Sequence, residues 1–388
     1  MVVLKICNME KNPLVSVVIP TYNRYEYLYA CVDATRSIES AELEIVIQDN
    51  TEDNKDFKAF IENINDSRIK YYHKAEHVSV VDNCDMGILH ANGDYICMIG
   101  DDDCACESII RAARYCKEND IESCCFPFPG FNWGDMTFER GIKKRARYNI
   151  RVKADGLIKS LDSRKEFEKS LHNGAGLKPT MPRVYHGLVA RVCLDRIYNK
   201  LGTFFPGPSP DMANAVAVCM ESKSTVYIGD YLIVSGYCHK SSTGEGNRGQ
   251  HFGRIEDKPW LPKDTIEKWD KNIPMVFSGE TIIAQSTVQA MQLCGCDTKT
   301  YKYPYAQLYA TFFWHHKDIA KNTLLFCMKT PWRFFQFIKG CMERALVKTN
   351  TSGYVYDYEN DEVDTLIEAK SYTDNMNKAL KYETCVKE

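Results

Sequence analysis

The chain has 388 residues, with 49 Lys and Arg against 52 Asp and Glu, so its formal net charge is −3. A balance this close to neutral excludes bulk electrostatic capture of nucleic acid, and we expect no nucleic-acid partner. With 44% hydrophobic and 26% charged residues, the composition is that of a globular protein with a large core, which excludes disorder over the full length.

The 17 cysteines lie in apolar runs, and none of their spacings repeats in the pattern of a zinc ribbon. This usage favours free, buried thiols in a reducing compartment. The N-terminal residues 1–13 lack the apolar stretch of a signal peptide, and no uncharged apolar run approaches the ~20 residues that cross a bilayer. We therefore predict a cytoplasmic protein without structural zinc.

The first hundred residues alternate between short apolar runs, typical of buried strands, and stretches with helical periodicity. The expected strands are residues 14–20, 43–47, 69–72 and 94–99, and the expected helices between them are 25–40, 56–63 and 80–91. Alternation of this kind predicts a parallel sheet covered by helices, which is an α/β fold.

Three polar clusters follow expected strands: residues 21–24, Asp49 with Asn50, and Asp101, Asp102 and Asp103. In a parallel sheet, ligands bind beyond the carboxyl ends of the strands, where the following loops gather. The topology alone therefore brings these three clusters to one edge of the sheet.

After residue 120 the periodicity of the sequence is weaker. Residues 202–210 predict a Gly/Pro loop before Asp211 and a helix at 212–220, and residues 226–234 predict a strand. From about residue 260 the pattern is helical. We expect one domain at 1–260 and a helical extension at 261–388.

Residues 317–348 combine seven Lys and Arg with five Phe and Trp residues. A basic, aromatic, amphipathic segment can lie on an anionic membrane surface. The alternative is an ordinary helix that packs its aromatic side chains on the domain at 1–260. The sequence leaves both interpretations open.

Three consecutive carboxylates at a strand end repel one another unless a cation neutralises them. Oxygen ligands in small number suit Mg²⁺ or Mn²⁺, which keep positions open for water and for the phosphate oxygens of a substrate. The alternative for Asp101, Asp102 and Asp103 is a solvated acidic turn.

The segments VSVVIPTYNR (15–24), EIVIQDNTED (44–53) and NCDMGILHANGDYICMIGDDD (83–103) together resemble the family 2 glycosyltransferases of the GT-A fold. The resemblance covers about the first 110 residues in order, spacing and motif. It implies a Rossmann-like, mostly parallel sheet flanked by helices, followed here by a C-terminal helical extension.

The resemblance makes 1–260 a catalytic domain, with a nucleotide-binding half at 1–110 and an acceptor-binding half at 111–260. It also implies roles for residues of the nucleotide-binding half. Pro20, Thr21, Tyr22 and Arg24 would lie beside the base and ribose, and Asp49 would accept hydrogen bonds from a uracil ring. Asp101 would bind the ribose, while Asp102 and Asp103 would hold Mn²⁺ or Mg²⁺ at the diphosphate. Many members carry Asp where this chain has Gly100, so which of the three carboxylates binds metal stays open.

The remaining site residues lie later in the chain, apart from Asn83. By its place in the family pattern, Asp211 is the expected general base that deprotonates the acceptor hydroxyl; alternatively it caps the following helix. His239 and Lys240 would contact the diphosphate, His186 could line the acceptor pocket, and Asn83 would approach the base or cap its helix.

The resemblance implies a metal-dependent, inverting transferase that moves a sugar from a nucleotide-sugar donor, UDP-linked in most members, to a glycan or polyprenyl-linked acceptor. Such an enzyme would act in the cytoplasm, peripherally on the inner face of the cell membrane. Two alternatives are a sugar nucleotidyltransferase and a catalytically silent carbohydrate-binding protein. The first is disfavoured because no glycine-rich phosphate loop follows the first strand.

Overall fold

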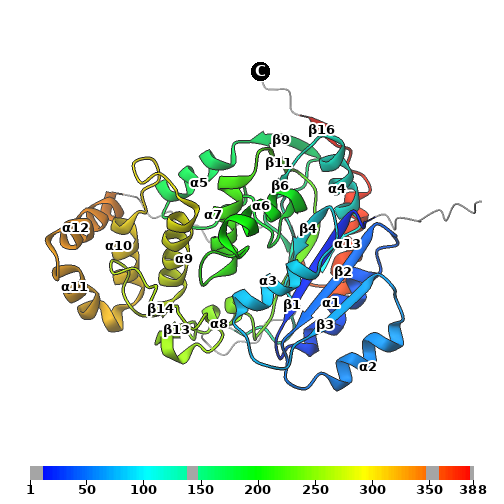
Figure 1. Ribbon diagram of the computed structural model, residues 1–388, viewed down its shortest axis with the longest axis horizontal. Helices are drawn as coiled ribbons and strands as arrows, with labels where there is room; N and C mark the ends of the chain where they lie inside the picture. The colour runs from blue at the N-terminus through cyan, green and yellow to red at the C-terminus, as the bar shows by residue number, and fades with distance from the viewer. Residues whose placement is uncertain (1–11, 138–146, 347–357, 385–388) are drawn as a thin grey trace, which may run out of the picture.

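The structure is a computed structural model that describes residues 12–137, 147–346 and 358–384 (Figure 1). Over these ranges the main sheet has nine strands in the order β16-β9-β11-β6-β10-β4-β1-β2-β3. Five of its eight neighbouring pairs are parallel, which confirms the α/β class and the mostly parallel sheet. The strands are β1 (Val15–Thr21), β2 (Leu43–Asp49), β3 (Ile69–His73), β4 (Tyr95–Met98), β6 (Ser123–Cys125), β9 (Leu157–Leu161), β10 (Leu188–Ala190), β11 (Thr225–Ile228) and β16 (Glu383–Thr384).

Helices cover both faces of the sheet, because side chains on a strand alternate between its two sides. Val17 and Ile19 of β1 lie in the same hydrophobic cluster as residues of α1 and α4. Val18 lies in a second cluster with residues of α3 and α6. The helices on the two faces are α1 (Tyr25–Arg36), α4 (Ser108–Glu118), α3 (Val80–His90) and α6 (Arg191–Leu201), and α2 (Lys55–Ile64) links β2 to β3.

The strand register brings the expected polar clusters to one edge. Thr21 pairs with Asp49 at the end of β1 and β2, and Val18 pairs with Met98 at the end of β4. The third residue after Met98 is Asp101, so the carboxylate turn lies level with Thr21. The convergence expected from the order of the strands is therefore confirmed.

A second sheet, in the order β15-β8-β7-β12-β5, lies next to this edge. Its strands are β5 (Cys104–Ala105), β7 (Gly130–Asn132), β8 (Arg147–Ile150), β12 (Ile233–Tyr237) and β15 (Tyr358–Asn360). The single strand expected at 226–234 is wrong, because the chain leaves the first sheet at Gly229 and Asp230 and enters the second as β12. The buried Asp230 fixes this break by pairing with Arg111 and accepting a hydrogen bond from the Tyr231 amide.

The helices after residue 260 pack on α7 and on one another. Met212 and Val216 of α7 share a cluster with Met291 of α9, while Tyr309 of α10 and Phe337 of α12 belong to a separate core. Within the described ranges, no helix combines the length and the apolar character that crossing a bilayer requires. The helices are α5 (Ser163–His172), α7 (Pro210–Glu221), α8 (Ser242–Asn247), α9 (Gly279–Cys294), α10 (Tyr305–His315), α11 (Ala320–Met328) and α12 (Pro331–Leu346).

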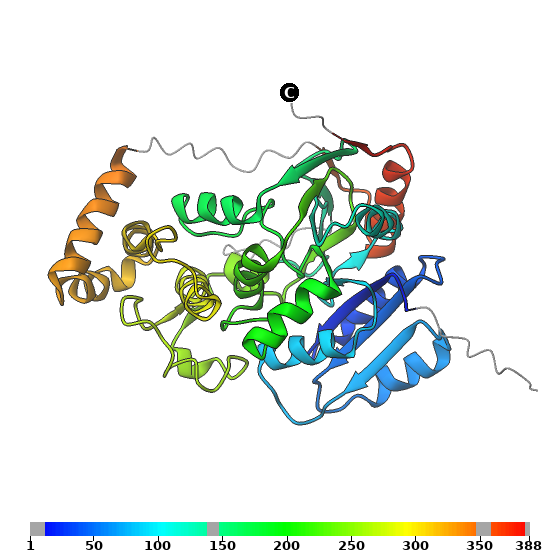
Figure 2. The ribbon, with the colours of Figure 1, turned by 45° about the horizontal axis from the view of Figure 1, so that its top comes forward.

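The last described segment returns to the first half of the chain (Figure 2). Helix α13 (Leu366–Asn377) packs against α1 and β12, and β16 joins the edge of the main sheet. Inside α13, the buried Lys370 donates to Asp374 over 2.6 Å, and Asp374 accepts from the Glu107 amide over 2.9 Å. Residues 358–384 therefore pack on α1 and on the two sheets.

The cysteines support the prediction of free thiols. All fifteen that fall in the described ranges are free, and thirteen of them are buried. Burial raises the pKa of several, including Cys97 and Cys193, so these thiols stay protonated and pack as small apolar side chains.

Candidate active site

The carboxylate turn begins directly after β4 and is buried: Asp101, Asp102 and Asp103 are each at most 4% exposed. It is not the solvated acidic turn that the sequence left as an alternative. Gly100 precedes the turn, and a Cβ there would lie 2.9 Å from the Asp102 carboxylate. A side chain at position 100 would therefore press on the packed carboxylates.

Asp103 is fully engaged by the protein. Its Oδ2 accepts from the Gly100 amide and lies 2.6 Å from His186 Nε2, while its Oδ1 accepts from the Gly236 amide over 2.7 Å. Gly236 is required by this approach, because a Cβ there would lie 1.8 Å from the Asp102 carbonyl oxygen. Asp103 thus joins the main sheet to β12, and its oxygens are less available to a metal than the sequence suggested.

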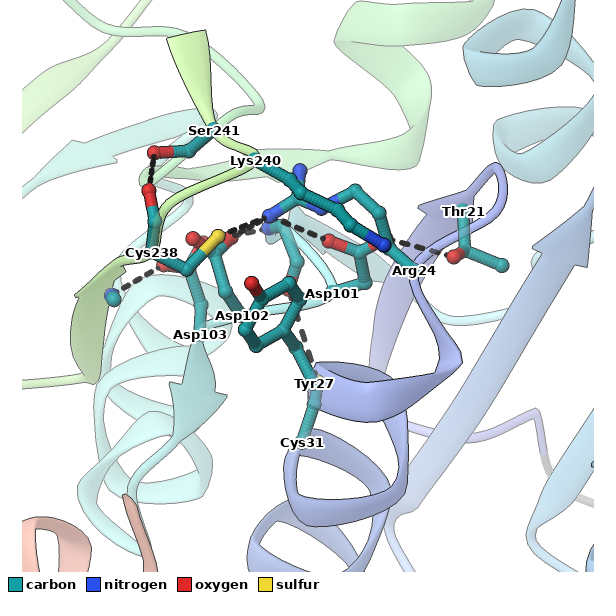
Figure 3. Close-up of polar contacts among 12 residues, drawn as sticks. Thr21, Arg24, Tyr27, Cys31, Asp101, Asp102, Asp103, Cys238, Lys240 and Ser241 are labelled. Carbon is teal, nitrogen blue, oxygen red and sulfur yellow. Dashed lines mark hydrogen bonds and ion pairs between the residues drawn. The ribbon is translucent and has the colours of Figure 1, made fainter. Parts of the chain in front are cut away.

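Asp101 and Asp102 share one cation. Arg24 Nη2 lies 3.1 Å from Asp101 and 3.0 Å from Asp102, and Thr21 donates to Asp101 over 2.7 Å (Figure 3). Although burial opposes its charge, the two carboxylates raise the pKa of Arg24, so the guanidinium is always ionised. Asp102 Oδ2 is buried without a hydrogen-bond partner. This oxygen is the best candidate ligand for an added cation.

The carboxylates remain strained by their proximity even with Arg24 present. Burial and the neighbouring Asp102 raise the pKa of Asp101 to about 7, with Arg24 and Thr21 opposing the shift. Burial and Asp103 likewise raise the pKa of Asp102, again against Arg24. A divalent cation beside Asp102 would relieve this repulsion. In the described part of the chain, however, no three His, Cys, Asp or Glu side chains form a preassembled metal site.

Cys238 completes the surroundings of Arg24, and sequence reasoning missed it. Its Sγ lies 3.0 Å from Arg24 Nη2 and its thiol is hydrogen-bonded to Asp102. Burial and the Asp102 charge raise the pKa of Cys238 to about 12, so the thiol stays protonated and can donate to the carboxylate. Only the strand pairing of β12 with β5 brings this residue to the turn.

Asp49 is held by hydrogen bonds within the protein. It is fully buried, and its carboxylate accepts from the Tyr25 and Tyr71 hydroxyls, each over 2.6 Å, and from the Thr51 amide over 2.8 Å. These bonds hold the loop after β2 in place, and the contact of Asp49 with a base stays a prediction.

Other residues at the same edge are better placed to meet a base. Tyr22 is half exposed, and its ring centroid lies 5.5 Å from that of His77. Pro20 lies within β1, opposite Gln48. Asn83 is buried in α3, where its Nδ2 donates to the Thr21 carbonyl over 3.2 Å. Its side chain therefore positions the end of β1, and the cap of α3 is made by Ser79 instead.

His239 and Lys240 follow β12 at the rim of the site. His239 Nδ1 lies 3.1 Å from the Thr137 hydroxyl, and its amide donates to Asp135, which also accepts from the Tyr27 hydroxyl. Lys240 forms an ion pair with Glu26 of α1. Both residues are close enough in sequence to Cys238 to border the carboxylate turn, and their contact with a diphosphate stays a prediction.

Asp211 lies in the first turn of α7 and does not cap it. The N-cap residue is Ser209, and neither side chain makes a capping hydrogen bond. Burial raises the pKa of Asp211, and so does the charge of Asp103, while Arg183 and His186 oppose the shift. The structure thus brings Asp211 within electrostatic reach of the carboxylate turn, as its proposed role requires.

His186 connects these two parts of the site. Its φ is +55°, a left-handed conformation that costs free energy in a residue with a Cβ. The ring stacks on Tyr185 at 4.0 Å between centroids and lies 2.6 Å from Asp103. Tyr185 is in turn paired with Met98 at the end of β4. A strained, buried histidine between Asp103 and Asp211 is typical of a functional site.

A cleft of about 1200 Å³ opens between α5, α8, α9, α10 and α12. Four of the nine histidines in the chain line it. Glu280 lies at its base and is hydrogen-bonded to His315 and His316; although burial opposes the shift, these bonds lower the pKa of Glu280 to about 2. The loop before Asp211 abuts α9, since the Ser209 amide donates to Ser286 over 2.7 Å. Helix α9 therefore contacts both the cleft and the loop that precedes Asp211.

Comparison with known proteins gives a consistent set of matches. Residues 16–172 match the family model described as Glycosyl transferase family 2. The glycosyltransferase GlyG of Streptococcus pneumoniae serotype 4 is 31% identical over 127 residues, which are 32% of this chain and 42% of GlyG. The chain therefore spans less than half the length of this curated relative.

Several solved structures are similar at low sequence identity. The complex of S. aureus TarS 1–349 with UDP-GlcNAc has a TM-score of 0.48 at 13% identity, over 84% of this chain and 79% of the other. The mannosyltransferase PcManGT from Pyrobaculum calidifontis, in complex with GDP-Man and Mn²⁺, has a TM-score of 0.40 at 14% identity, over 87% and 89% of the two chains.

Proposed function

We propose that this chain, whose residues 16–172 form a glycosyl transferase family 2 domain, moves a sugar from a nucleotide diphosphate sugar to a hydroxyl group of a glycan or lipid-linked glycan. The observation that carries the proposal is the buried carboxylate turn, which holds more negative charge than Arg24 alone neutralises. Such a site is unfavourable on its own and becomes favourable when a substrate brings a cation.

The donor would lie across the shared edge of β1, β2 and β4. The half-exposed Tyr22 and the neighbouring His77 offer aromatic surface to a base, and Asp101 can accept from a ribose hydroxyl. Arg24 would turn from the two carboxylates toward the diphosphate, where its planar fork binds phosphate oxygens. We propose UDP as the nucleotide, in keeping with most of the family.

The residues present fit a divalent cation. Asp102 would hold Mn²⁺ or Mg²⁺ through its unpartnered Oδ2, and Asp103 would orient the turn through His186 and Gly236. A metal bound there would supply positive charge for the departing diphosphate.

Asp211 is proposed as the general base. The acceptor oxygen forms a bond to the anomeric carbon while the bond from that carbon to the diphosphate oxygen breaks, and the nucleoside diphosphate leaves with the electron pair. The acceptor proton passes to Asp211, whose pKa burial has raised toward the range useful for a base. Attack from the face opposite the leaving group gives inversion.

The acceptor would enter through the cleft that Glu280 and the histidines line. The hydrogen-bonding groups that line the cleft suit the hydroxyls of a glycan. Helix α9, which forms one wall of the cleft, contacts the loop that precedes Asp211. We propose a cytoplasmic enzyme at the inner face of the cell membrane, where a polyprenyl-linked glycan would be presented.

The test is an assay of UDP release and of sugar transfer, with UDP-, GDP- and dTDP-sugars as donors and cell-envelope glycans as acceptors. Transfer that needs Mn²⁺ or Mg²⁺ and is lost in Asp102→Asn would support the proposal. A protein that binds glycans but releases no nucleotide from any donor would be the silent binding protein considered as an alternative.

A further inference from the structure

Exposed apolar side chains are concentrated in one part of this protein. Of the eighteen large hydrophobic residues that are exposed in the described chain, nine lie between residues 314 and 346. Isolated exposed hydrophobics are ordinary, whereas a concentrated set marks a surface that another phase or molecule covers. The nine are Trp314, Leu325, Met328, Trp332, Phe334, Phe335, Ile338, Met342 and Leu346.

Helix α12 is apolar on two opposite sides. On the inner side Phe337 is 6% exposed and packs on Phe313 at 5.2 Å, and a Cβ at Gly340 would lie 1.9 Å from the Ala306 carbonyl oxygen. On the outer side four residues at helical spacing stand in solvent. They are Phe335 (65% exposed), Ile338 (37%), Met342 (62%) and Leu346 (83%), and we call them the outer face of α12.

The contacts on the inner side bear on the two interpretations that the sequence left open for residues 317–348, a membrane-surface segment or an ordinary packed helix. Residues 320–346 do pack as ordinary helices, but their packing on α10 uses only the inner side of α12. Phe335, Met342 and Leu346 contribute nothing to the core that the structure describes. Packing within the described residues therefore does not account for their apolar character.

The charge around this face is positive. Residues 317–346 contain six Lys and Arg against Asp318 and Glu343. Four of the basic side chains, Lys317, Lys321, Lys329 and Lys339, are exposed, and Lys339 also lies 3.7 Å from Glu343. Arg333 is instead tied to the fold, because it donates to the Lys271 carbonyl over 2.6 Å. Exposed lysines beside a large apolar face complement a surface that is anionic outside and apolar inside.

The position of the helix pair also suits a flat partner. Helices α11 and α12 form the end of the molecule that lies farthest from β2, β3 and α2, and both views show them as its outermost elements (Figures 1 and 2). Nothing described projects beyond them on that side. A broad surface can therefore approach the outer face of α12 without meeting the catalytic half.

We propose that the outer face of α12, with the exposed residues of α11, lies in the interface of an anionic lipid bilayer. Phe335, Ile338, Met342 and Leu346 enter the boundary between headgroups and acyl chains, and the lysines meet acidic headgroups. The contact is interfacial, since no described helix can span the bilayer. This proposal does not depend on the sugar-transfer reaction.

If the proposed transferase function holds, the outer face of α12 would place the cleft close to the bilayer. Gly340, Glu343 and Arg344 of α12 line the cleft, on the side of the helix turned away from Phe335 and Met342. An α-helix with its side chains is about 10 Å thick. The bilayer would thus lie about one helix diameter from the cleft, within reach of a glycan carried on a lipid.

The experiment is co-sedimentation of the full chain with vesicles of phosphatidylcholine alone and of phosphatidylcholine mixed with phosphatidylglycerol. We expect binding to the anionic vesicles that weakens as salt is raised. The double variant Phe335→Asp/Met342→Asp should bind about tenfold more weakly or worse. The matched control Val192→Asp/Leu293→Asp changes two equally exposed apolar residues elsewhere and should bind like the unmodified chain.

Three results would overturn the proposal. The first is an unmodified chain that stays in solution with both kinds of vesicle. The second is equal loss of binding in the control variant. The third is a dimer of the unmodified chain that becomes monomeric in Phe335→Asp/Met342→Asp without any vesicle binding, which would make the outer face an interface between two copies. Circular dichroism of each variant establishes that it is folded, and Lys321→Glu/Lys329→Glu tests the electrostatic part separately.

Discussion

The carboxylate turn and the outer face of α12 depart from ordinary protein chemistry in opposite ways. The turn buries Asp101, Asp102 and Asp103 side by side, where charge is costly, and the helix exposes Phe335 and Met342 to water, where apolar surface is costly. Each region is unfavourable in the isolated chain and would become favourable with a partner of complementary chemistry. For the turn, we propose a metal-bound nucleotide sugar, and for the helix, an anionic bilayer.

The two regions differ in how strongly the fold holds them. The turn is fixed by many contacts from four separate segments, including Thr21, His186 and Gly236. Among the described residues, no hydrogen bond or ring contact holds Phe335 or Met342 of the outer face of α12, and this face depends on the packing of the inner side. We therefore expect changes at the turn to affect catalysis strongly and changes on the outer face to leave the folded chain nearly unaltered.

The largest expected effect is at Asp102. Asp102→Asn should lower turnover by about 10³-fold or more, because the proposed cation ligand is lost. The same change should not lower the melting temperature at neutral pH, since it removes one of the crowded buried charges. Steady-state kinetics and differential scanning calorimetry measure the two effects. Asp94→Asn, at an exposed ion pair, serves as the control.

The next effect is at Asp211. Asp211→Asn should reduce kcat by about 10²-fold or more while the dissociation constant for the donor changes little, as expected for a lost general base. In the unmodified enzyme, activity should rise with pH as Asp211 ionises, and this acidic limb should vanish in the variant. A variant that keeps both its rate and its acidic limb would leave Asp211 as a structural residue.

The two faces of α12 give a comparison within one helix. Phe337→Ala should destabilise the protein by about 3 kcal/mol or more, since it leaves a cavity against α10. Phe335→Ala should change stability by about 0.5 kcal/mol or less. Urea unfolding of the two variants measures the difference. Equal losses would mean that Phe335 is covered within the folded chain.

A smaller effect is expected in the cleft. Glu280→Gln should raise the KM for the acceptor about tenfold, because it loosens His315 and His316, and should leave donor binding unchanged. Glu62→Gln, at an exposed ion pair of α2 outside the cleft, is the control. A change in donor affinity instead would place the cleft outside the acceptor path.

The last prediction concerns the pH dependence of stability without metal. The pKa of Asp101 is about 7 in the folded protein and about 3.9 in an unfolded chain, so between these values the folded state holds a proton that the unfolded state has lost. Raising the pH through this window therefore destabilises the fold. In EDTA the melting temperature should fall from about pH 4 to about pH 7 more steeply than in Asp101→Asn.

Local patterns in the sequence predicted the parts of this molecule that depend on neighbours along the chain. The strands β1 to β4 and the helices between them lie where apolar periodicity placed them, and the register of Thr21, Asp49 and the carboxylate turn follows from parallel pairing. The resemblance to glycosyl transferase family 2 over the same residues agrees with the family match.

The parts that were missed depend on residues far apart in sequence. Asp103 is saturated by His186 and Gly236, and Cys238 meets Arg24, across separations that no local pattern encodes. The hydrogen bonds of Asp49 to Tyr25 and Tyr71, which come from other elements, were likewise not visible in the sequence. The return of α13 to the sheet could not be read for the same reason.

The most direct test of the central claim is a thermal-shift measurement of the unmodified protein and Asp102→Asn with UDP-sugars, in Mn²⁺, in Mg²⁺ and in EDTA. A ligand that binds only the folded state raises the melting temperature. The account predicts a shift with at least one UDP-sugar that requires metal and disappears in Asp102→Asn. A shift of equal size in EDTA, or in the variant, would contradict the assignment of the carboxylate turn as the cation and donor site.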